Sequence, residues 1–274
     1  TAMNEEESLE VMKIHSIAGK LQPASGLMRT RPFRSPHHTI SAHGLIGGGS
    51  VPKPGEVSLS HHGVLFLDEF PEFSRAALEV LRQPLEDGCV TIARARASYT
   101  FPTKFLLAAA MNPCPCGYAG VKGGKRTCNC SSHRKVQYVA KVSGPLLDRI
   151  DIHVEVPLVD YSKLSYVATP LSSAEMREQV RVAEERQRAR YKSENIRSNQ
   201  ELSGAALRKY CSLNMETERL MHSYYEQLAL SIRAHDRILK IARTIADLDN
   251  QEHIQVAHLA EAIQYRALDH TYLT

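Results

Sequence analysis

The strongest constraint in this chain is a short apolar run that ends in two acids, GVLFLDEF at residues 63–70. Val64 to Leu67 have the apolar character of a strand buried in a parallel sheet. Because α/β sheets bind ligands at the carboxyl ends of their strands, we expect Asp68 and Glu69 in such a crevice. Asp68 is suited to hold a magnesium ion through water, and Glu69 to polarise an attacking water. A solvated surface turn with two acids fits these residues equally well.

The bulk composition limits the possible classes of protein. With 274 residues, 43% hydrophobic and 23% charged, the chain has room for one large domain or two small ones. No apolar run approaches the roughly 18 to 20 residues of a membrane span, and the amino-terminal stretch is acidic and amphipathic, unlike a signal peptide. We therefore expect a cytoplasmic protein without a membrane partner. The net charge of +4 is mild, so a nucleic-acid surface requires local clustering of basic residues.

The sequence pattern changes near residue 160. Before this point glycine, proline and short apolar runs alternate with helical patterns, which predicts an α/β domain over residues 1–160. Beyond it almost every stretch has helical period and glycine nearly vanishes, which predicts an all-α domain over residues 161–274. The stretch VDYSKLSYVATPLSS, residues 159–173, is the expected linker.

The expected elements follow from periodicity and from capping residues. In the first half we predict helices over residues 5–18 and 74–85, strands over residues 64–67, 104–112 and 151–157, and a hairpin over residues 89–101. In the second half we predict a helical bundle, with helices over residues 173–191, 205–211, 216–228, 232–248 and 256–268.

Several long motifs occur in a specific order along the chain. They are RPFRSPHHTISAHGLIGGGSVPKPGEVSLSHHGVLFLDEF, LEVLRQPLEDGCVTIARA, AAAMNPCPCGYAG and SGPLLDRIDIHVEVP. Together they closely resemble the magnesium-chelatase-like AAA+ ATPases, and within that family the ComM/YifB competence-protein group. SIRAHDRILKIARTIADL is similar to the helical domain of that group, so the resemblance covers essentially the whole chain. It implies a partial AAA+ core, with a parallel sheet, flanking helices and β-hairpin inserts, followed by a helical lid domain.

The resemblance also implies roles for single residues. Asp68 and Glu69 match the Walker B acids, and Asn112 matches the first sensor, an amide that orients the lytic water. Arg149 matches the arginine finger that reaches into the neighbouring subunit's site. Arg233 matches the second sensor, which belongs to the helical domain. Without the family match, Asn112 would be read as an Asn-Pro turn and Arg149 as a surface ion pair.

One feature of the family is missing from the sequence. Its members carry a P-loop, GxxxxGK[ST], just upstream of the segment that begins this chain, and no such run occurs in the 274 residues. GLIGGGSVPKPG has neither the spacing nor the strand-then-helix setting of a phosphate cradle. Because residue 1 is Thr, we expect a piece of a longer protein that has lost the P-loop and a Lon-protease-like amino-terminal domain. Since the P-loop supplies most phosphate contacts, the chain alone is expected to be inactive as an ATPase.

The cysteines form a second constellation. Two CxC pairs stand eleven residues apart, and their members are Cys114, Cys116, Cys128 and Cys130. Disulfides are disfavoured in a cytoplasmic protein, whereas four thiolates gathered by one loop suit tetrahedral zinc. Free thiols are the alternative, and His133 is a possible substitute ligand. Cys89 and Cys211 are isolated and are expected to be packing residues.

Five histidines crowd into a short stretch, His37, His38, His43, His61 and His62. They lack a matching carboxylate and a regular ligand spacing, so we assign them to loop structure and not to metal binding.

The predicted hairpin carries a candidate DNA-binding surface. Arg94 and Arg96 alternate with apolar residues and so share one face of a strand, with Lys104 just beyond. Such a pair is usually an ordinary solvated surface. If the hairpin lines the channel of a ring, the same residues are placed to track a phosphate backbone.

The resemblance implies a parent ATP hydrolase that uses ATP and Mg²⁺ and self-associates into a hexameric ring. The leading interpretation is a DNA translocase or helicase that acts in recombination or natural transformation. One alternative is an ATP-driven insertase subunit like magnesium chelatase, although the chelatase subunits lack the two CxC pairs. The other is a non-enzymatic, zinc-stabilised module for DNA binding or assembly.

Overall fold

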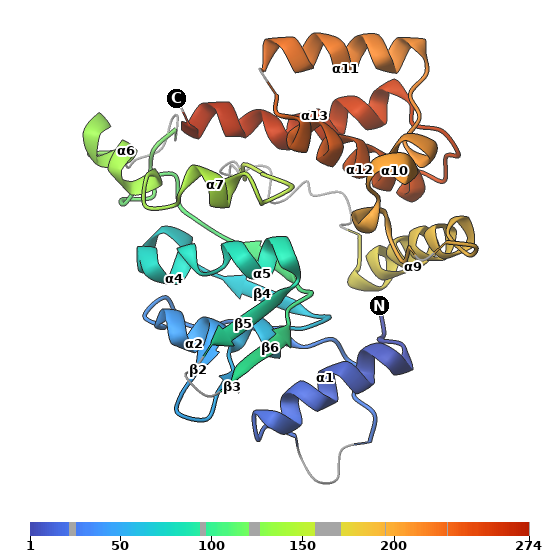
Figure 1. Cartoon of the computed structure of the whole chain (residues 1–274). Helices are drawn as coiled ribbons and strands as arrows, with labels where there is room; N and C mark the ends of the chain where they lie inside the picture. Colours follow the sequence, from blue (N-terminus) through green and yellow to red (C-terminus); the bar gives the residue numbers. More distant parts are fainter. Residues whose placement is uncertain are drawn as a thin grey trace. The chain divides into compact units, whose positions relative to one another are not determined.

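The computed structural model describes residues 1–21, 26–93, 97–120, 127–156, 171–194, 196–228 and 230–273. The chain divides into two compact units, residues 2–150 and residues 151–274 together with Thr1. The first unit is α/β and the second is helical, as predicted, and Figure 1 shows the elements of each. The predicted domain boundary near residue 160 stays a prediction, because residues 157–170 lie outside the described ranges.

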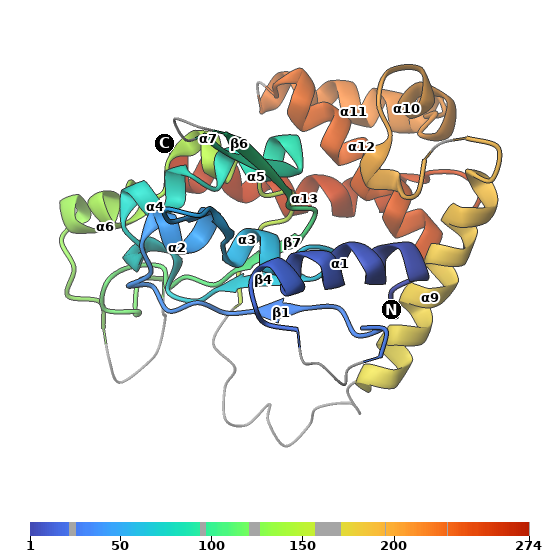
Figure 2. The ribbon, with the colours of Figure 1, turned by 60° about the horizontal axis from the view of Figure 1, so that its bottom comes forward.

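A parallel sheet with the strand order β1-β4-β7 forms the centre of the α/β unit. Its strands are β1 (Phe33–Arg34), β4 (Val64–Leu67) and β7 (Leu106–Ala109), and they can be followed in Figure 2. The middle strand, β4, is the apolar run that ends in two acids, so the predicted buried strand is confirmed. The register pairs Leu67 of β4 with Ala109 of β7.

One face of β4 faces the hydrophobic core of the unit. Leu65 and Leu67 are fully buried, whereas Val64 and Phe66, which point to the other face, are half-buried. The core around them includes Leu45, Val57, Phe70, Leu78, Leu81 and Leu146. Since burying one such side chain contributes about 1.5 to 3 kcal/mol, a one-residue slip of β4 would be strongly unfavourable.

Helices flank this sheet. They are α1 (Glu5–Ile17), α2 (Ala42–Ile46), α3 (Glu56–Leu59), η1 (Phe70–Glu72), α4 (Arg75–Glu79), α5 (Arg82–Asp87), α6 (Ser132–Val139) and α7 (Gly144–Leu147). α1 matches its prediction: Asn4 and Glu7 form a capping box at its start, and Gly19, with φ of 69°, follows its end.

Two antiparallel pairs complete the unit. They are β2 (Gly47–Gly48) with β3 (Lys53–Pro54), and β5 (Cys89–Ala93) with β6 (Ser98–Pro102). The second pair confirms the predicted hairpin, although residues 94–96 lie outside the described residues.

Two predictions about the elements of the first half were wrong. The single helix expected from Ser74 to Leu85 is two helices, α4 and α5. Pro84 explains the break: proline lacks an N–H, and it is tolerated only in a first turn such as that of α5. The strand expected at residues 151–157 is absent over its described part, 151–156, because no described strand lies beside it to form a ladder.

The second unit is a helical bundle, as the sequence predicts. Its elements are α9 (Ser173–Arg190), η2 (Asn199–Glu201), α10 (Gly204–Tyr210), α11 (Met215–Gln227), α12 (Ile232–Leu248) and α13 (Val256–Leu273). α12 packs against α9, α10 and α13. Its buried side chains Ile238 and Ala242 share a core with Leu259 and Ile263 of α13.

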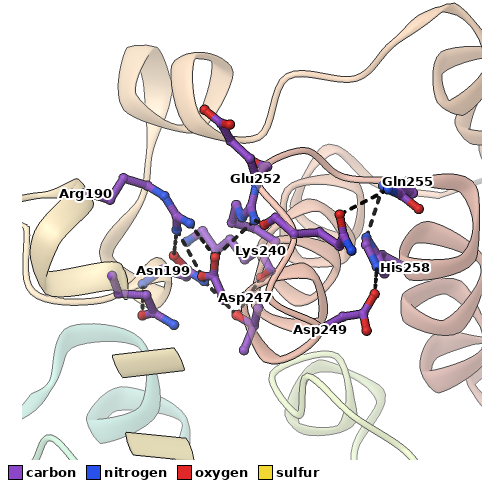
Figure 3. Close-up of polar contacts among 12 residues, drawn as sticks. Arg190, Asn199, Lys240, Asp247, Asp249, Glu252, Gln255 and His258 are labelled. Atoms are coloured by element: carbon purple, nitrogen blue, oxygen red, sulfur yellow. Dashed lines mark hydrogen bonds and ion pairs between the residues drawn. The ribbon is translucent and has the colours of Figure 1, made fainter. Parts of the chain in front are cut away.

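A buried polar network joins α9, η2 and α12 (Figure 3). Asp247 of α12 is fully buried and accepts hydrogen bonds from Arg190 of α9 at 3.0 Å and from Asn199 of η2 at 2.9 Å. Arg243, one turn earlier on α12, also donates to Asp247 and to the carbonyl oxygen of Glu252. The hydrogen bond to Asp247 raises the pKa of Arg190. Removing one member would leave buried charges unpaired, so this network fixes how the three elements pack.

No helix in the described ranges has both the length and the apolar character to cross a bilayer.

Candidate functional site

Three predicted site residues follow the carboxyl ends of two neighbouring strands of the parallel sheet. Asp68 and Glu69 directly follow β4, and Asn112 lies three residues after the end of β7. The pairing of these strands continues beyond them, because Ala110 N–H donates to the Leu67 carbonyl oxygen at 3.0 Å. In turn, Phe70 N–H donates to the Ala110 carbonyl oxygen at 2.9 Å. The acids and the amide therefore emerge from neighbouring strands at the carboxyl edge, where α/β sheets bind ligands.

Glu69 lies at a sharp turn of the backbone. Its φ of 53° and ψ of 44° are left-handed, a conformation that non-glycine residues adopt at a cost of about 1 to 3 kcal/mol. The turn is stabilised by the Glu69 N–H, which donates to Oδ1 of Asp68 at 2.9 Å. The Glu69 side chain keeps 54% of its surface exposed, so a substrate can reach its carboxylate.

His38, predicted from the sequence to belong to loop structure, contacts this acid. Nδ1 of His38 lies 3.0 Å from Oε2 of Glu69. His38 follows β1, the strand on the other side of β4 from β7. The contact joins residues that are far apart in the sequence, so only the strand order of the sheet brings them together. No pattern in the sequence predicts this contact between His38 and Glu69.

Two further residues lie close to Asn112. Gly117 has a left-handed backbone, with φ of 79°. It lies so close to Asn112 that a Cβ at this position would be 4.0 Å from Oδ1 of Asn112. Tyr138 of α6 is buried, and burial, together with the charges of Glu72, Cys114 and Glu69, raises its pKa. A backbone hydrogen bond from Asn112 to Tyr138 lowers this pKa and only partly offsets the increase. Asn112 is therefore adjacent to the loop that holds the first pair of cysteines.

Arg149 is engaged within its own unit. It follows α7, forms a short ion pair with Glu86 of α5, and donates from Nη1 to the Pro145 carbonyl oxygen at 2.6 Å. Only 12% of its side-chain surface is exposed. Both contacts hold Arg149 beside α5 and α7, and its role as an arginine finger stays a prediction.

The remaining predicted residues lie elsewhere. Arg233 is exposed on the first turn of α12, in the helical unit, and its role as second sensor stays a prediction. Lys104 is exposed just before β7, and its backbone N–H and carbonyl oxygen bond to His61 and His62. Arg94 and Arg96 lie outside the described residues.

The four predicted metal ligands come together. One sulfur atom from each of Cys114, Cys116, Cys128 and Cys130 lies within 4.8 Å of the others. The closest approaches are 3.3 Å for Cys114–Cys116, 3.6 Å for Cys116–Cys128 and 3.7 Å for Cys114–Cys128. Thiolates around tetrahedral zinc, at about 2.3 Å from the metal, lie about 3.8 Å from one another. The described cysteines therefore fit a structural zinc ion, and His133 is not among the clustered ligands.

The loop backbone shapes this cysteine cluster. Gly117 N–H donates to the Cys114 carbonyl oxygen at 2.9 Å, and the left-handed Gly117 closes the tight turn. A backbone hydrogen bond from Tyr118 lowers the pKa of the Cys116 thiol to about 6. Burial acts in the opposite direction on a second member of the cluster and raises the pKa of the Cys130 thiol to about 11.

Two of the histidines meet a carboxylate that sequence spacing did not reveal. Glu10 of α1 lies 3.1 Å from Nε2 of His61 and 2.7 Å from Nε2 of His62. The three side chains are close enough to hold a metal ion. However, Nδ1 of His61 accepts the Lys104 N–H at 3.0 Å, so the neutral ring carries its proton on Nε2. That proton donates to Glu10, and the cluster is a hydrogen-bonded tie between α1 and the segment before β4.

Family models match both halves of the chain. The model described as magnesium chelatase, subunit ChlI, matches residues 1–164. The model described as magnesium chelatase, subunit ChlI C-terminal, matches residues 170–266.

Curated relatives match most of the chain. The competence protein ComM of Haemophilus influenzae is 45% identical over 242 residues, which are 88% of this chain and 46% of that protein. The uncharacterised protein YifB of Escherichia coli is 42% identical over 268 residues, 97% of this chain and 51% of that protein. An uncharacterised protein of Mycobacterium tuberculosis is 39% identical over 261 residues, 95% of this chain and 51% of that protein. The chain thus spans about half the length of the curated relatives it matches.

Proposed function

Because the chain belongs to the magnesium chelatase subunit ChlI family, we propose that it forms the hydrolytic edge of an AAA+ ATPase. The observation that carries this proposal is the emergence of Asp68, Glu69 and Asn112 from two paired parallel strands at one edge of the sheet. Phosphoryl transfer to water requires carboxylates that hold a cation and polarise the water, with an amide beside them.

The proposed roles divide among these residues. Asp68 holds the Mg²⁺ of the substrate through water, and Glu69 accepts the proton of the attacking water. Asn112 donates a hydrogen bond that orients this water beside the γ-phosphate. Magnesium, when bound, neutralises charge that develops on the phosphate oxygens.

Two arginines are proposed to supply further positive charge. Arg149 acts on the site of a neighbouring copy in a ring, and Arg233 acts from the helical unit. Arg149 is paired with Glu86 in the structure, so this role requires that ion pair to open when a neighbour's phosphate competes for the guanidinium. Self-association and the role of Arg149 are tested together by Arg149→Ala mixed with wild-type protein: loss of hydrolysis out of proportion to the variant's share supports them.

The chain alone is proposed to lack ATPase activity. Its 274 residues hold no P-loop, whose backbone amides and lysine would supply most phosphate contacts. We expect the purified chain to show no ATP turnover above background, whereas a protein of the relatives' length that contains it turns over ATP. Steady turnover by the chain that is lost in Glu69→Gln would contradict this.

DNA is the proposed macromolecule on which the motor acts. The relative from Haemophilus influenzae is named a competence protein, which supports a role in natural transformation. Within that role, or in recombination, the proposed activity is that of a DNA translocase or helicase. The exposed Lys104, with Arg94 and Arg96, is proposed to contact the phosphate backbone. The double variant Arg94→Ala with Arg96→Ala in the longer protein should weaken DNA binding and flatten its salt dependence. Unchanged binding removes these two residues from the proposal.

The family description favours a second candidate, an ATP-driven insertase subunit like magnesium chelatase. The two candidates differ in what stimulates ATP hydrolysis by the longer protein. Duplex or branched DNA stimulates the motor, whereas a chelatase partner subunit with a tetrapyrrole stimulates the insertase. DNA binding by the chain without any nucleotide would instead favour a zinc-stabilised binding module.

A structural zinc ion in the cysteine cluster completes the proposal. Four sulfur atoms within 4.8 Å of one another support it. When bound, zinc supplies folding energy to the loop and no chemistry to hydrolysis. Metal analysis after zinc-supplemented expression tests the site, and a small fraction of an equivalent would contradict it.

A further inference from the structure

The positive charge of this chain comes from one stretch of its sequence. Residues 88–147 hold nine lysines and arginines and no aspartate or glutamate. The rest of the chain holds 25 basic and 30 acidic residues, so the net charge of +4 is due to this stretch alone. Such a segregation of charge is typical of a surface that meets a polyanion, because the basic residues have no acids in their own segment to neutralise them.

Helix α6, which lies within this stretch, presents two of the basic residues. Arg134 is exposed and Lys135 is half-buried, and both lie in the first half of the helix. Within the described ranges, neither side chain forms an ion pair. The acid that reaches this region, Glu72, is paired with Lys141 instead, at 3.0 Å between Oε2 and Nζ. The charges of Arg134 and Lys135 are therefore available to an anion from outside the unit.

Helix α6 is fixed near both of its ends. At its start, Oγ of Ser131 accepts the Arg134 N–H at 3.3 Å, and Ser131 directly follows Cys130 of the cysteine cluster. Toward its end, the buried Tyr138 is hydrogen-bonded to the backbone of Asn112, beyond β7. Cations on an element that is already ordered lose less conformational entropy when they bind, so this anchoring favours binding of an anion by α6.

The rest of the α6 surface favours a phosphate backbone over a membrane. A helix that lies on a bilayer buries a broad apolar face in it. The exposed residues of α6 are instead polar apart from Val136, and they include His133 and Gln137, which lie 3.4 Å apart. Neutral polar side chains beside an arginine and a lysine are the usual donors to phosphate oxygens of DNA.

We propose that α6, through Arg134 and Lys135, is a second DNA-binding surface that contacts the phosphate backbone. This inference rests on the proposed action on DNA and deepens it, because it adds a surface separate from the hairpin residues Arg94 and Arg96. A contact made by two cations with phosphates carries no sequence preference and weakens as salt rises, because binding releases counterions from the DNA.

The test measures DNA binding by the longer protein that contains this chain. A fluorescently labelled duplex of mixed sequence is titrated in the presence of a non-hydrolysable ATP analogue, and anisotropy is followed at several salt concentrations. The variant is Arg134→Ala with Lys135→Ala, which keeps the helix because alanine is the best helix former. Since each neutralised phosphate contributes about 0.9 to the slope of log K against log salt, the slope should become shallower by about 2. At about 0.1 M salt, the affinity should fall roughly 10- to 100-fold.

A matched control separates a local contact from an effect of net charge. Lys13→Ala with Arg75→Ala also removes one lysine and one arginine, from exposed positions of α1 and α4 in the same unit but outside residues 88–147. This control should keep the wild-type affinity and salt slope. An equal loss in the control and in the α6 variant would show that only net charge matters, and it would overturn the inference.

The remaining outcomes distinguish this inference from the proposed function. Unchanged affinity and slope in the α6 variant, in a protein whose wild type binds DNA, overturn the inference and leave the proposed function standing. If that variant instead loses binding to vesicles of phosphatidylserine and phosphatidylcholine, α6 faces a membrane and the inference is wrong. A wild-type protein that does not bind DNA overturns the proposed action on DNA, and the inference with it.

Discussion

Leu67 and Ala109 are paired neighbours, the last two residues of the parallel strands β4 and β7 to face each other in register. From this pair the two chains continue to Asp68 and to Asn112, and hydrogen bonds between them extend to Ala110. The acids and the amide are therefore placed by the backbone of a buried sheet and not by a long loop. Groups placed in this way keep their geometry, which proximity-based catalysis requires.

The first prediction concerns Asn112. Asn112→Ala in the longer protein should lower kcat by about 100-fold, because removal of one well-placed hydrogen-bond donor from a transition state typically has an effect of that order. The affinity for ATP should change little, since Asn112 is proposed to act on the water and not on the nucleotide. A loss of nucleotide binding that explains the whole loss of rate would contradict the role. Met111→Ala, at the exposed preceding residue, is the control.

The second prediction concerns the cysteine cluster. Cys114→Ser should reduce the bound zinc from about one equivalent to a small fraction, because tetrahedral structural sites use all four ligands. Zinc content by elemental analysis is the measurement. Cys89→Ser, a half-buried cysteine of β5 outside the cluster, should leave the content unchanged.

Metal removal gives a spatial version of the same prediction. A chelator should disorder residues 113–132 and leave the strands β4 and β7 intact, because their pairing does not involve the cysteines. Hydrogen exchange resolved by segment measures both regions. Loss of protection in β4 as early as in the cysteine loop would show that the site supports the whole unit.

The third prediction concerns the polar network of the helical unit. Asp247→Ala leaves Arg190 and Arg243 without their shared buried carboxylate, and it should lower the free energy of unfolding by about 3 to 5 kcal/mol. Asp236→Ala, at a more exposed acid of the same helix, should change it by about 0.5 kcal/mol or less. Equal effects of the two substitutions in urea unfolding would argue that the network contributes nothing specific.

The fourth prediction concerns acid stability. Burial lowers the pKa of His61 to about 4, from an ordinary value near 6.5, so the unfolded chain binds this proton more readily than the folded chain. Stability from the neutral ring is therefore complete above pH 6.5 and is lost as the pH falls toward 4, with a total of about 3 kcal/mol. His61→Asn should flatten the unfolding free energy over this window. His43→Asn, at an exposed site, should reproduce the wild-type slope.

Much of the fold follows from local sequence patterns. The apolar run before Asp68, the capping box of α1 and the periodic stretch of α12 depend on neighbouring residues, so the sequence predicts them. The helical pattern predicted one continuous helix over α4 and α5, but Pro84 interrupts it. The strand predicted at 151–157 is absent over its described part, 151–156, because a strand needs a partner, which a local pattern cannot supply.

The site is predicted in part, for the same reason. The four cysteines were found because metal ligands show regular spacing. The contacts of His38 with Glu69, of Glu10 with His61, and of Arg149 with Glu86 join distant segments. Each depends on which strands and helices become neighbours, and no spacing rule encodes that.

The most direct test of the central claim is ATP hydrolysis by the longer protein that contains this chain, measured with and without Glu69→Gln. This substitution keeps the size of the side chain and removes the charge that would polarise water. We predict clear hydrolysis by the wild type, and a variant that still binds ATP but turns it over at least about 100-fold more slowly. Hydrolysis at the wild-type rate in Glu69→Gln would contradict the assignment of this sheet edge as the hydrolytic site.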